Sequence, residues 1–173
     1  MGLSSNILWH QTTLDGLKGI LNEQGFFYSY SLESILSRES KNNLNVAFPM
    51  VSLCDLPFSE LNDYIKKYGG YLIGMKRTWG KSNGLAPVWY CDSESTILNA
   101  IIDRYNQIEV NIKNGKNFTI SREIFLYTLS HIKNYEGQLI AHDFNKYRFY
   151  DEREFRSVPR YKELKKLYKK FRV

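Results

Sequence analysis

The stretch Phe48-Pro49-Met50-Val51-Ser52-Leu53-Cys54 is an apolar run of strand length, and it predicts a buried β-strand. The residues that follow, Asp55-Leu56-Pro57, predict a strand-to-helix junction, because aspartate is a favourable N-cap and proline suits the first turn of a helix. We expect this helix to run to about Tyr68 and to end at Gly69-Gly70. A further strand, 71–76, follows directly.

Strands and helices alternate irregularly on both sides of this core stretch. The patterns predict strands at 6–10, 48–54, 71–76, 87–91 and 150–158, and helices at 13–23, 31–38, 57–68, 95–112 and 121–132, with a polar loop at 41–45 and a turn at 114–117. This order does not specify one parallel sheet. We therefore expect an α+β fold, with a single domain, a mixed sheet and surrounding helices.

Composition places the chain among globular proteins. It has 173 residues, of which 43% are hydrophobic and 15% aromatic, and this is enough for one domain with a substantial core. No segment approaches the roughly 20 apolar residues that a membrane span requires, and the N-terminus lacks a secretory pattern. We expect a cytoplasmic protein that does not engage a membrane.

The sequence lacks the residue patterns that mark common classes of enzyme. Cys54 and Cys91 each lie beside apolar residues with no His/Cys partner at ligand spacing, so we expect reduced core thiols and no metal site. His131 and His142 also lack such partners. No Ser-His-Asp order, HExxH motif, P-loop or GxGxxG motif occurs. The chain therefore does not fit the usual hydrolase, metalloprotease or NTPase patterns.

The net charge of the chain resides in its C-terminal segment. Residues 1–159 carry 17 basic and 17 acidic residues, whereas residues 160–173 carry seven basic residues and one acidic residue, which accounts for the net +6. We therefore divide the chain into an α+β domain, 1–159, and a basic amphipathic helix, 160–173.

This segment has two sides and two possible roles. An apolar stripe at helical spacing predicts that the segment docks on the domain, and it comprises Tyr161, Leu164, Leu167, Tyr168 and Phe171. The exposed lysines could instead bind nucleic acid or an acidic partner, and they include Lys165, Lys166, Lys169 and Lys170.

A charged run near the end of the domain, Tyr150-Asp151-Glu152-Arg153-Glu154-Phe155-Arg156, is the best indication of a functional site. In a strand, Glu152, Glu154 and Arg156 project to one side, and Arg153 and Phe155 to the other. Paired carboxylates in a cleft can orient a sugar hydroxyl or stabilise developing positive charge, and nearby arginines keep them ionised or bind phosphate. The alternative is a solvated strand face. His10 and Thr12, at the end of the first strand, could reach one ligand, although a structural histidine explains the same position.

Several short motifs follow one another along the chain. They are Leu8-Trp9-His10-Gln11-Thr12, Leu17-Lys18-Gly19-Ile20-Leu21, Phe48 to Pro57, Tyr68-Gly69-Gly70-Tyr71-Leu72-Ile73-Gly74-Met75, Trp79-Gly80, Pro87-Val88-Trp89-Tyr90 and Asp151-Glu152-Arg153-Glu154-Phe155-Arg156. Their order resembles the AbiGi family of bacterial abortive-infection proteins over about residues 8–160. The resemblance implies a phage-resistance protein of a two-component system, usually labelled the antitoxin, with a partner protein.

The chain also combines a first strand that ends in His10-Gln11-Thr12, a helix of the Leu-x-x-Ile-Leu type, and a late strand with Glu152-Arg153-Glu154. This combination resembles ADP-ribosyltransferases, especially those that modify nucleic acids. The resemblance implies NAD as co-substrate. Under it, His10 and Thr12 bind the nicotinamide side, Glu154 or Glu152 holds a ribose hydroxyl and stabilises an oxocarbenium-like transition state, and Arg153 or Arg156 pairs with the pyrophosphate.

Three functional hypotheses follow. The first is a phage-defence enzyme with an ADP-ribosyltransferase-like fold that transfers ADP-ribose to nucleic acid or protein. The second is a non-catalytic antitoxin-type module, in which Glu152 and Glu154 form structural ion pairs with Arg153, Arg156 or Arg148 and the tail engages a toxin or nucleic acid. The third is a plain nucleic-acid binder, for which only the tail argues.

Overall fold

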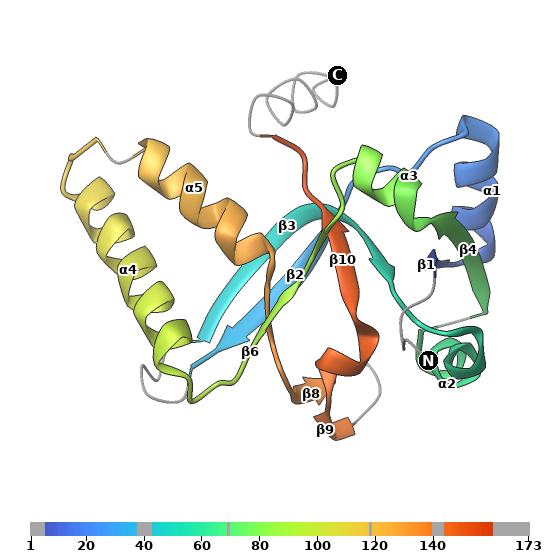
Figure 1. Ribbon diagram of the computed structural model, residues 1–173. Coiled ribbons are helices and arrows are strands. Elements are labelled where there is room, and N and C mark those ends of the chain that lie inside the picture. The colour runs from blue at the N-terminus through green and yellow to red at the C-terminus, as the bar shows by residue number, and fades with distance from the viewer. Residues whose placement is uncertain (1–5, 38–42, 69, 118, 140–143, 161–173) are drawn as a thin grey trace.

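The computed structural model describes residues 6–37, 43–68, 70–117, 119–139 and 144–160 (Figure 1). Helices and strands are mixed along the chain, which confirms the α+β class. The helices are α1 (Leu14–Glu23), α2 (Leu61–Tyr68), α3 (Arg77–Ser82), α4 (Thr96–Lys113) and α5 (Thr119–Ser130), with 3-10 turns η1 (Phe58–Glu60) and η3 (Phe149–Glu152). The strands are β1 (Ile7–Thr12), β2 (Ser29–Leu36), β3 (Asn43–Cys54), β4 (Tyr71–Lys76), β5 (Ala86–Pro87), β6 (Trp89–Cys91), β7 (Ile132–Asn134), β8 (Gly137–Leu139), β9 (Phe144–Tyr147) and β10 (Glu154–Ser157).

The long strand β3 organises the main sheet, whose order is β4-β1-β3-β10-β5, with β2 also paired to β3. All of these pairings are antiparallel. Strand β10 lies along one edge of β3, at Val51 to Cys54. The opposite edge is shared: β2 follows it from Asn43 to Met50, and β1 meets it at Cys54. Strands β1 and β2 thus lie end to end along β3 with a short gap between them, which we call the strand gap.

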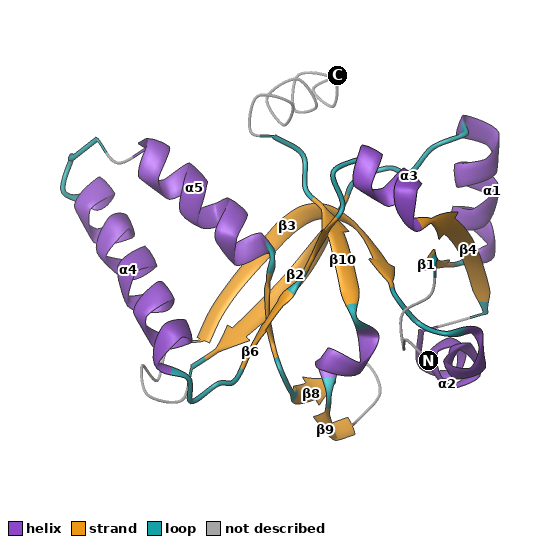
Figure 2. Cartoon of the chain, in the orientation of Figure 1, coloured by secondary structure: helices purple, strands orange, loops and turns teal. Residues whose placement is uncertain are grey.

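Side chains alternate along β3, so its two faces bury different clusters. Phe48 and Met50 face α4 and α5, which form a helical hairpin on one side of the sheet (Figure 2). Val51 and Leu53 face the opposite way and pack with residues near α3. The first cluster contains Ile35, Phe48, Met50, Leu98, Ile102, Tyr105, Leu129 and Ile132, and the second contains Leu8, Val51, Leu53 and Leu85. A third, small cluster beneath α2 joins Cys54, Leu56 and Leu61.

Two helices begin at residues whose side chains cap them. Thr13 accepts a hydrogen bond from the backbone of Gly16 at the start of α1. Ser95 is the N-cap of α4 and accepts a hydrogen bond from the backbone of Leu98. Asp55, the expected N-cap after β3, instead forms an ion pair with Arg77, and Pro57 occupies the N-cap position of η1 without a side-chain bond.

The helix predicted at 31–38 is wrong, because residues 31–36 belong to strand β2. The segment contains Leu32, Ile35 and Leu36, whose spacing also suits a helix, but it pairs with β3 over the whole of Ser29–Leu36. A continuous antiparallel ladder satisfies every second backbone group and buries Ile35 in the main core. Pairing with a distant strand therefore overrides the local pattern.

Three further boundaries differ from the prediction for the same kind of reason. The helix expected to reach residue 132 ends at Ser130, and Ile132–Asn134 forms β7, which pairs in parallel with β6. The strand expected at 87–91 is divided between β5 and β6, which belong to different sheets. The strand expected at 150–158 begins only at Glu154, after the turn η3. Helix α3 was not predicted, and the helix predicted at 160–173 lies, beyond Arg160, outside the described residues.

The cysteines and the helices bear on two expectations from composition. Cys54 and Cys91 are both free thiols, Cys54 being buried. Within the described ranges, no helix combines the length and apolar character needed to cross a membrane.

We predict that Leu98→Ala lowers the free energy of unfolding by about 2–5 kcal/mol, because it leaves a cavity in the main core. The neighbouring Ile97→Ala is a matched control, since Ile97 is 64% exposed on the same turn of α4 whereas Leu98 is 0% exposed. Urea denaturation monitored by circular dichroism measures both. Equal effects of the two substitutions would contradict the assignment of this face of α4 to the core.

Candidate functional site

A cluster of acidic and basic side chains is buried beside the C-terminal half of β3. Lys133 of β7 donates hydrogen bonds to Glu152 and Glu154, at 2.8 and 2.9 Å. Arg156 of β10 donates through Nε to Oε1 of Glu154 at 2.7 Å, and through Nη2 to Glu33 of β2 at 2.8 Å. We call these five residues, Glu33, Lys133, Glu152, Glu154 and Arg156, the buried charge cluster.

Arg156 is the most deeply buried member, with 0% of its side chain exposed. Its Nη1 atom donates to the backbone carbonyl of Ser130, at the end of α5, at 2.8 Å. Its guanidinium therefore reaches acceptors on β2, β10 and α5 at once. A guanidinium removed from water needs such a set of partners, because an unpaired buried charge is strongly unfavourable.

The turn before β10 places both glutamates within hydrogen-bonding distance of Lys133. Glu152 ends η3, and Arg153 adopts a left-handed backbone conformation with φ of 45° before Glu154 begins the strand. For a residue other than glycine this conformation is unfavourable by about 1 kcal/mol. Glu152 and Glu154 point inward, whereas Arg153 pairs with Glu60 at 2.8 Å. The glutamates and Arg153 thus project to different sides, as predicted, but a turn produces this arrangement and not a continuous strand.

The charges of Lys133 and Arg156 hold the carboxylate of Glu154 ionised. Burial raises the pKa of Glu154, but the charges of Lys133 and Arg156 outweigh it and hold the pKa at about 2. Burial likewise lowers the pKa of Lys133, and the surrounding carboxylates more than offset this, so its pKa is raised. At Glu33 burial outweighs the attraction of Arg156, and its pKa is raised.

Part of this cluster lines a polar pocket of about 280 Å³, which we call the charged pocket. Cys54 and Tyr64 lie at its wall, with the thiol and hydroxyl 3.0 Å apart, and burial raises the pKa of both. Both groups therefore stay protonated at neutral pH. The lining residues are Gln11, Ser31, Glu33, Ser52, Cys54, Tyr64, Lys133, Glu152 and Glu154.

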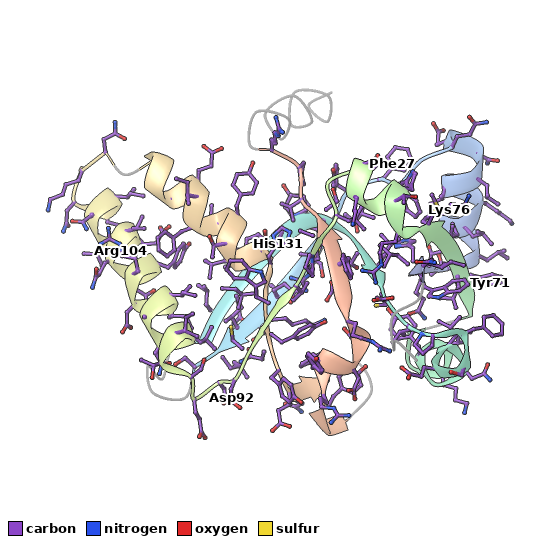
Figure 3. The ribbon with its side chains drawn as sticks, viewed as in Figure 1. Phe27, Tyr71, Lys76, Asp92, Arg104 and His131 are labelled. Carbon is purple, nitrogen blue, oxygen red and sulfur yellow. The ribbon has the colours of Figure 1, made fainter. Side chains whose placement is uncertain are left out.

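A second pocket, of about 450 Å³, opens at the strand gap, and we call it the aromatic pocket. It includes Phe26 and Phe27, which lie in the connection from α1 to β2; Phe27 is labelled in Figure 3. Gln11, Ser31 and Ser52 line both pockets, so the two adjoin one another. The other lining residues are His10, Thr12, Gly16, Gly19, Ile20, Ser29, Met50 and Val51.

A backbone carbonyl at the strand gap fixes the position of the His10 ring. Its Nδ1 atom lies 2.9 Å from the carbonyl oxygen of Ser52, so Nδ1 carries the proton and Nε2 is an acceptor. Its ring meets Phe26 edge to face, with the centroids 5.0 Å apart. Burial lowers the pKa of His10 despite the bond to Ser52, and the imidazole is therefore neutral at pH 7.

The structure separates the predicted site residues into three groups. Glu152 and Glu154 line the charged pocket, and His10 and Thr12 line the aromatic pocket. Trp9 pairs with Cys54, which in turn pairs with Glu154, so Glu154 and His10 project from opposite faces of the sheet. Arg153 and Arg156 line neither pocket. The ligand-binding roles of these residues stay predictions.

Several members of the site were not identified from the sequence. Lys133 lies in a three-residue strand next to a predicted helix, and no local pattern distinguishes it. His131, labelled in Figure 3, marks this junction between α5 and β7. Glu33 could have been found, because Ser31, Glu33 and Ile35 alternate as one face of a strand. Tyr90 was missed as well; its hydroxyl accepts a hydrogen bond from the backbone of Glu154 at 2.8 Å. Among the described residues, no group of His, Cys, Asp or Glu is arranged to hold a metal ion.

We predict that Glu154→Gln lowers the free energy of unfolding by about 3 kcal/mol, because it leaves Lys133 and Arg156 without their shared carboxylate. Denaturant titration at pH 7 measures the change. Asp151→Asn is the control, since it breaks an exposed ion pair with Arg148 and should leave the unfolding midpoint unchanged.

The same interaction predicts a pH dependence. The pKa of Glu154 lies at about 2 in the folded protein, against an ordinary value of 4.5. The ionised carboxylate therefore contributes its full stabilisation of the fold above pH 4.5, and this stabilisation is lost as the pH falls towards 2. Over this window the wild-type protein should lose more stability than Glu154→Gln does. Parallel stability curves for the two proteins would contradict the ionisation assigned to Glu154.

Comparison with known proteins identifies one family. The family model described as "Putative abortive phage resistance protein AbiGi, antitoxin" matches residues 24–171. The matched region contains the whole buried charge cluster, whereas His10 and Thr12 precede it. Comparisons with curated proteins and with solved structures gave no match. The resemblance to ADP-ribosyltransferases therefore stays a prediction.

Proposed function

The chain belongs to the AbiGi family, and from this premise we propose that it acts in phage defence as the antitoxin component of a two-component system. In this role it binds a partner toxin and suppresses the toxin's activity. The observation that carries the proposal is the family match, which extends over residues 24–171 and so includes the sheet from β2 to β10 as well as most of the basic tail.

The geometry of the buried charge cluster supports a binding role. Both carboxylate oxygens of Glu154 already accept hydrogen bonds, Oε1 from Arg156 and Oε2 from Lys133 and Arg156. Lys133 also bonds to Glu152. These charged groups are hydrogen-bonded to one another. This is the arrangement expected of a cluster that stabilises the fold on which a partner docks.

The charge distribution indicates how the partner is recognised. The domain is neutral, and the excess of positive charge lies in residues 160–173. A concentrated set of lysines attracts an acidic surface and accelerates association, and this attraction weakens as salt screens it. We therefore propose an acidic surface on the toxin as the partner of Lys165, Lys166, Lys169 and Lys170.

The test is growth of cells that express the toxin component together with this chain. Wild-type protein should restore growth, and replacing Lys165, Lys166, Lys169 and Lys170 by Glu should abolish rescue and weaken binding of the purified toxin by at least tenfold at low salt. The matched control replaces four exposed lysines of the domain by Glu, namely Lys18, Lys76, Lys81 and Lys116. Failure of wild-type protein to bind or neutralise the toxin would overturn the proposal, and equal loss in both variants would overturn the role of the tail.

A second candidate function is ADP-ribosyl transfer from NAD, and the two adjoining pockets favour it. A polar compartment with Glu152 and Glu154 lies next to one with His10 and Phe26, and such a pair suits a two-part ligand with a ribose and an aromatic ring. In this reaction the bond from the ribose to nicotinamide breaks, nicotinamide leaves with the bonding electrons, and an acceptor on nucleic acid or protein forms the new bond. A carboxylate near the ribose stabilises the positive charge that develops.

Under this candidate function, His10→Ala and Glu154→Gln should each reduce NAD consumption by at least a hundredfold. Release of nicotinamide measures the reaction, and thermal unfolding of each variant shows whether the fold persists. Gln138→Ala, an exposed substitution on β8 away from both pockets, is the control. Activity retained by a folded Glu154→Gln protein would refute the assigned roles.

A further inference from the structure

The two ends of the main sheet differ in how well they resist pairing with another chain. At one end, β5 has only two residues, and one of them is Pro87, which has no backbone N–H. At the other end, β4 has six residues, no proline and an unbroken register with β1. Among the described residues, β4 pairs with no strand other than β1. We call the side of β4 that faces away from β1 the β4 edge.

The backbone groups of alternate residues point out of the β4 edge. The N–H of Arg77, directly after β4, donates a hydrogen bond to the carbonyl oxygen of Asn6 at 2.8 Å. Hydrogen-bonded and non-hydrogen-bonded pairs alternate in an antiparallel ladder. Counting back from Arg77, every second residue therefore bonds to β1, and the residues between them direct N–H and C=O groups outward. The outward-directed residues are Leu72, Gly74 and Lys76.

Gly74 lies at the centre of the β4 edge, and its backbone is open to solvent. The residue is exposed, and a glycine has only backbone to expose. A side chain cannot replace it, because an added Cβ would lie 2.8 Å from the ring of Trp9 and 2.9 Å from the side chain of Ile7. Glycine in a strand often marks a place where another backbone approaches closely. The β4 edge is therefore a row of donors and acceptors that another strand complements.

One face of β4 has a projecting side chain at one end and a hollow at the other. Tyr71 begins the strand and is 40% exposed, whereas Lys76 ends it; Figure 3 labels both. At the Lys76 end, a hollow of about 500 Å³ opens between β4 and α3, and we call it the β4 groove. Its apolar wall is formed by Met75, which shares a face of β4 with Tyr71, and by Trp79. The other lining residues are Gly74, Lys76, Thr78 and Ser82.

This arrangement is complementary to itself under a two-fold rotation. Antiparallel pairing of two β4 strands centred on Gly74 brings the outward backbone groups of each copy against those of the other. Ile73 then lies opposite Met75 of the second copy, and Tyr71 lies one step further along the same face, beside the β4 groove of that copy. The projection and the hollow that receives it both belong to this chain, which favours a second copy over an unrelated partner.

The same register keeps like charges apart. Lys76 lies opposite Leu72 of the second copy, so that no two charged side chains of β4 face each other. The two Lys76 residues are about 13 Å apart along the strand direction. This separation exceeds the screening length of about 8 Å at physiological ionic strength.

We propose that the chain forms a two-fold dimer in which the β4 edges of two copies pair, with Tyr71 of each copy in the β4 groove of the other. The two main sheets thereby join into one. The contact satisfies the outward backbone groups of β4 and covers an edge that otherwise invites aggregation. This inference is independent of the proposed antitoxin function, since it concerns two copies of the same chain.

Sedimentation equilibrium of the full-length protein tests the proposal. The mass of the wild type should rise from 20.4 kDa towards twice that value as the concentration increases. Lys76→Pro should weaken association at least tenfold, because it removes an outward N–H, while the φ of −59° at this residue suits proline. Lys76→Ala keeps the N–H and is the matched control, which should associate within twofold of the wild type.

A second variant tests the fit between the projection and the hollow. Tyr71→Ser should weaken association at least fivefold, whereas Tyr30→Ser, which removes an exposed aromatic side chain from β2, should not. Circular dichroism shows whether each variant is folded. If Lys76→Pro does not fold, Tyr71→Ser decides the question.

Amide hydrogen exchange measured by NMR locates the contact. Raising the protein concentration should slow exchange of the outward amides of Leu72, Gly74 and Lys76 at least tenfold, because they gain partners only in the dimer. The amides of Ile73 and Met75, which already bond to β1, should change by less.

Three results would overturn the proposal. The first is a mass of 20.4 kDa at every concentration up to the solubility limit. The second is a dimer that neither Lys76→Pro nor Tyr71→Ser weakens, which assigns association to another surface. The third is protection of Gly74 that arises only when toxin is added, which assigns the β4 edge to the partner protein.

Discussion

The fully buried guanidinium of Arg156 is the constraint on which much of this structure depends. It bonds to Glu33 on β2, to the end of α5 at Ser130 and to Glu154 on its own strand. Removing a charge from water is so unfavourable that this arrangement is stable only when all of the partners are in place. The position of β10 against β3 is thereby coupled to the positions of β2 and of the α5–β7 junction.

The strand gap follows from the way in which two strands divide one edge of β3. Strand β2 pairs as far as Met50 and β1 pairs at Cys54, so none of the described strands pairs with the backbone between them on that edge. His10 satisfies the carbonyl of Ser52 there. Because a buried carbonyl needs a partner, the histidine has a structural role whatever else it does. The gap also explains why polar residues from three strands line two adjoining pockets.

The sequence predicted the elements whose signals are local. The strand at 71–76, the core strand ending at Cys54, and the helix expected at 95–112 are all present, since an apolar run or a helical apolar pattern specifies them without distant help. The glutamate pair was also recognised as a site of interest. Strand β2 was predicted as a helix, and Lys133 was overlooked, because their roles depend on pairing partners that lie far away in the sequence.

The sequence by itself determined the α+β class, the family resemblance, and the projection of Glu152 and Glu154 to the same side. These follow from composition, short motifs and the order of side chains over a few residues. Only the tertiary structure decided that Lys133 and Arg156 neutralise the glutamates, and that His10 lies on the opposite face of the sheet from Glu154. The reason is physical: side-chain periodicity is a local property, whereas strand register and the pairing of buried charges are set by contacts between segments that the chain brings together only on folding.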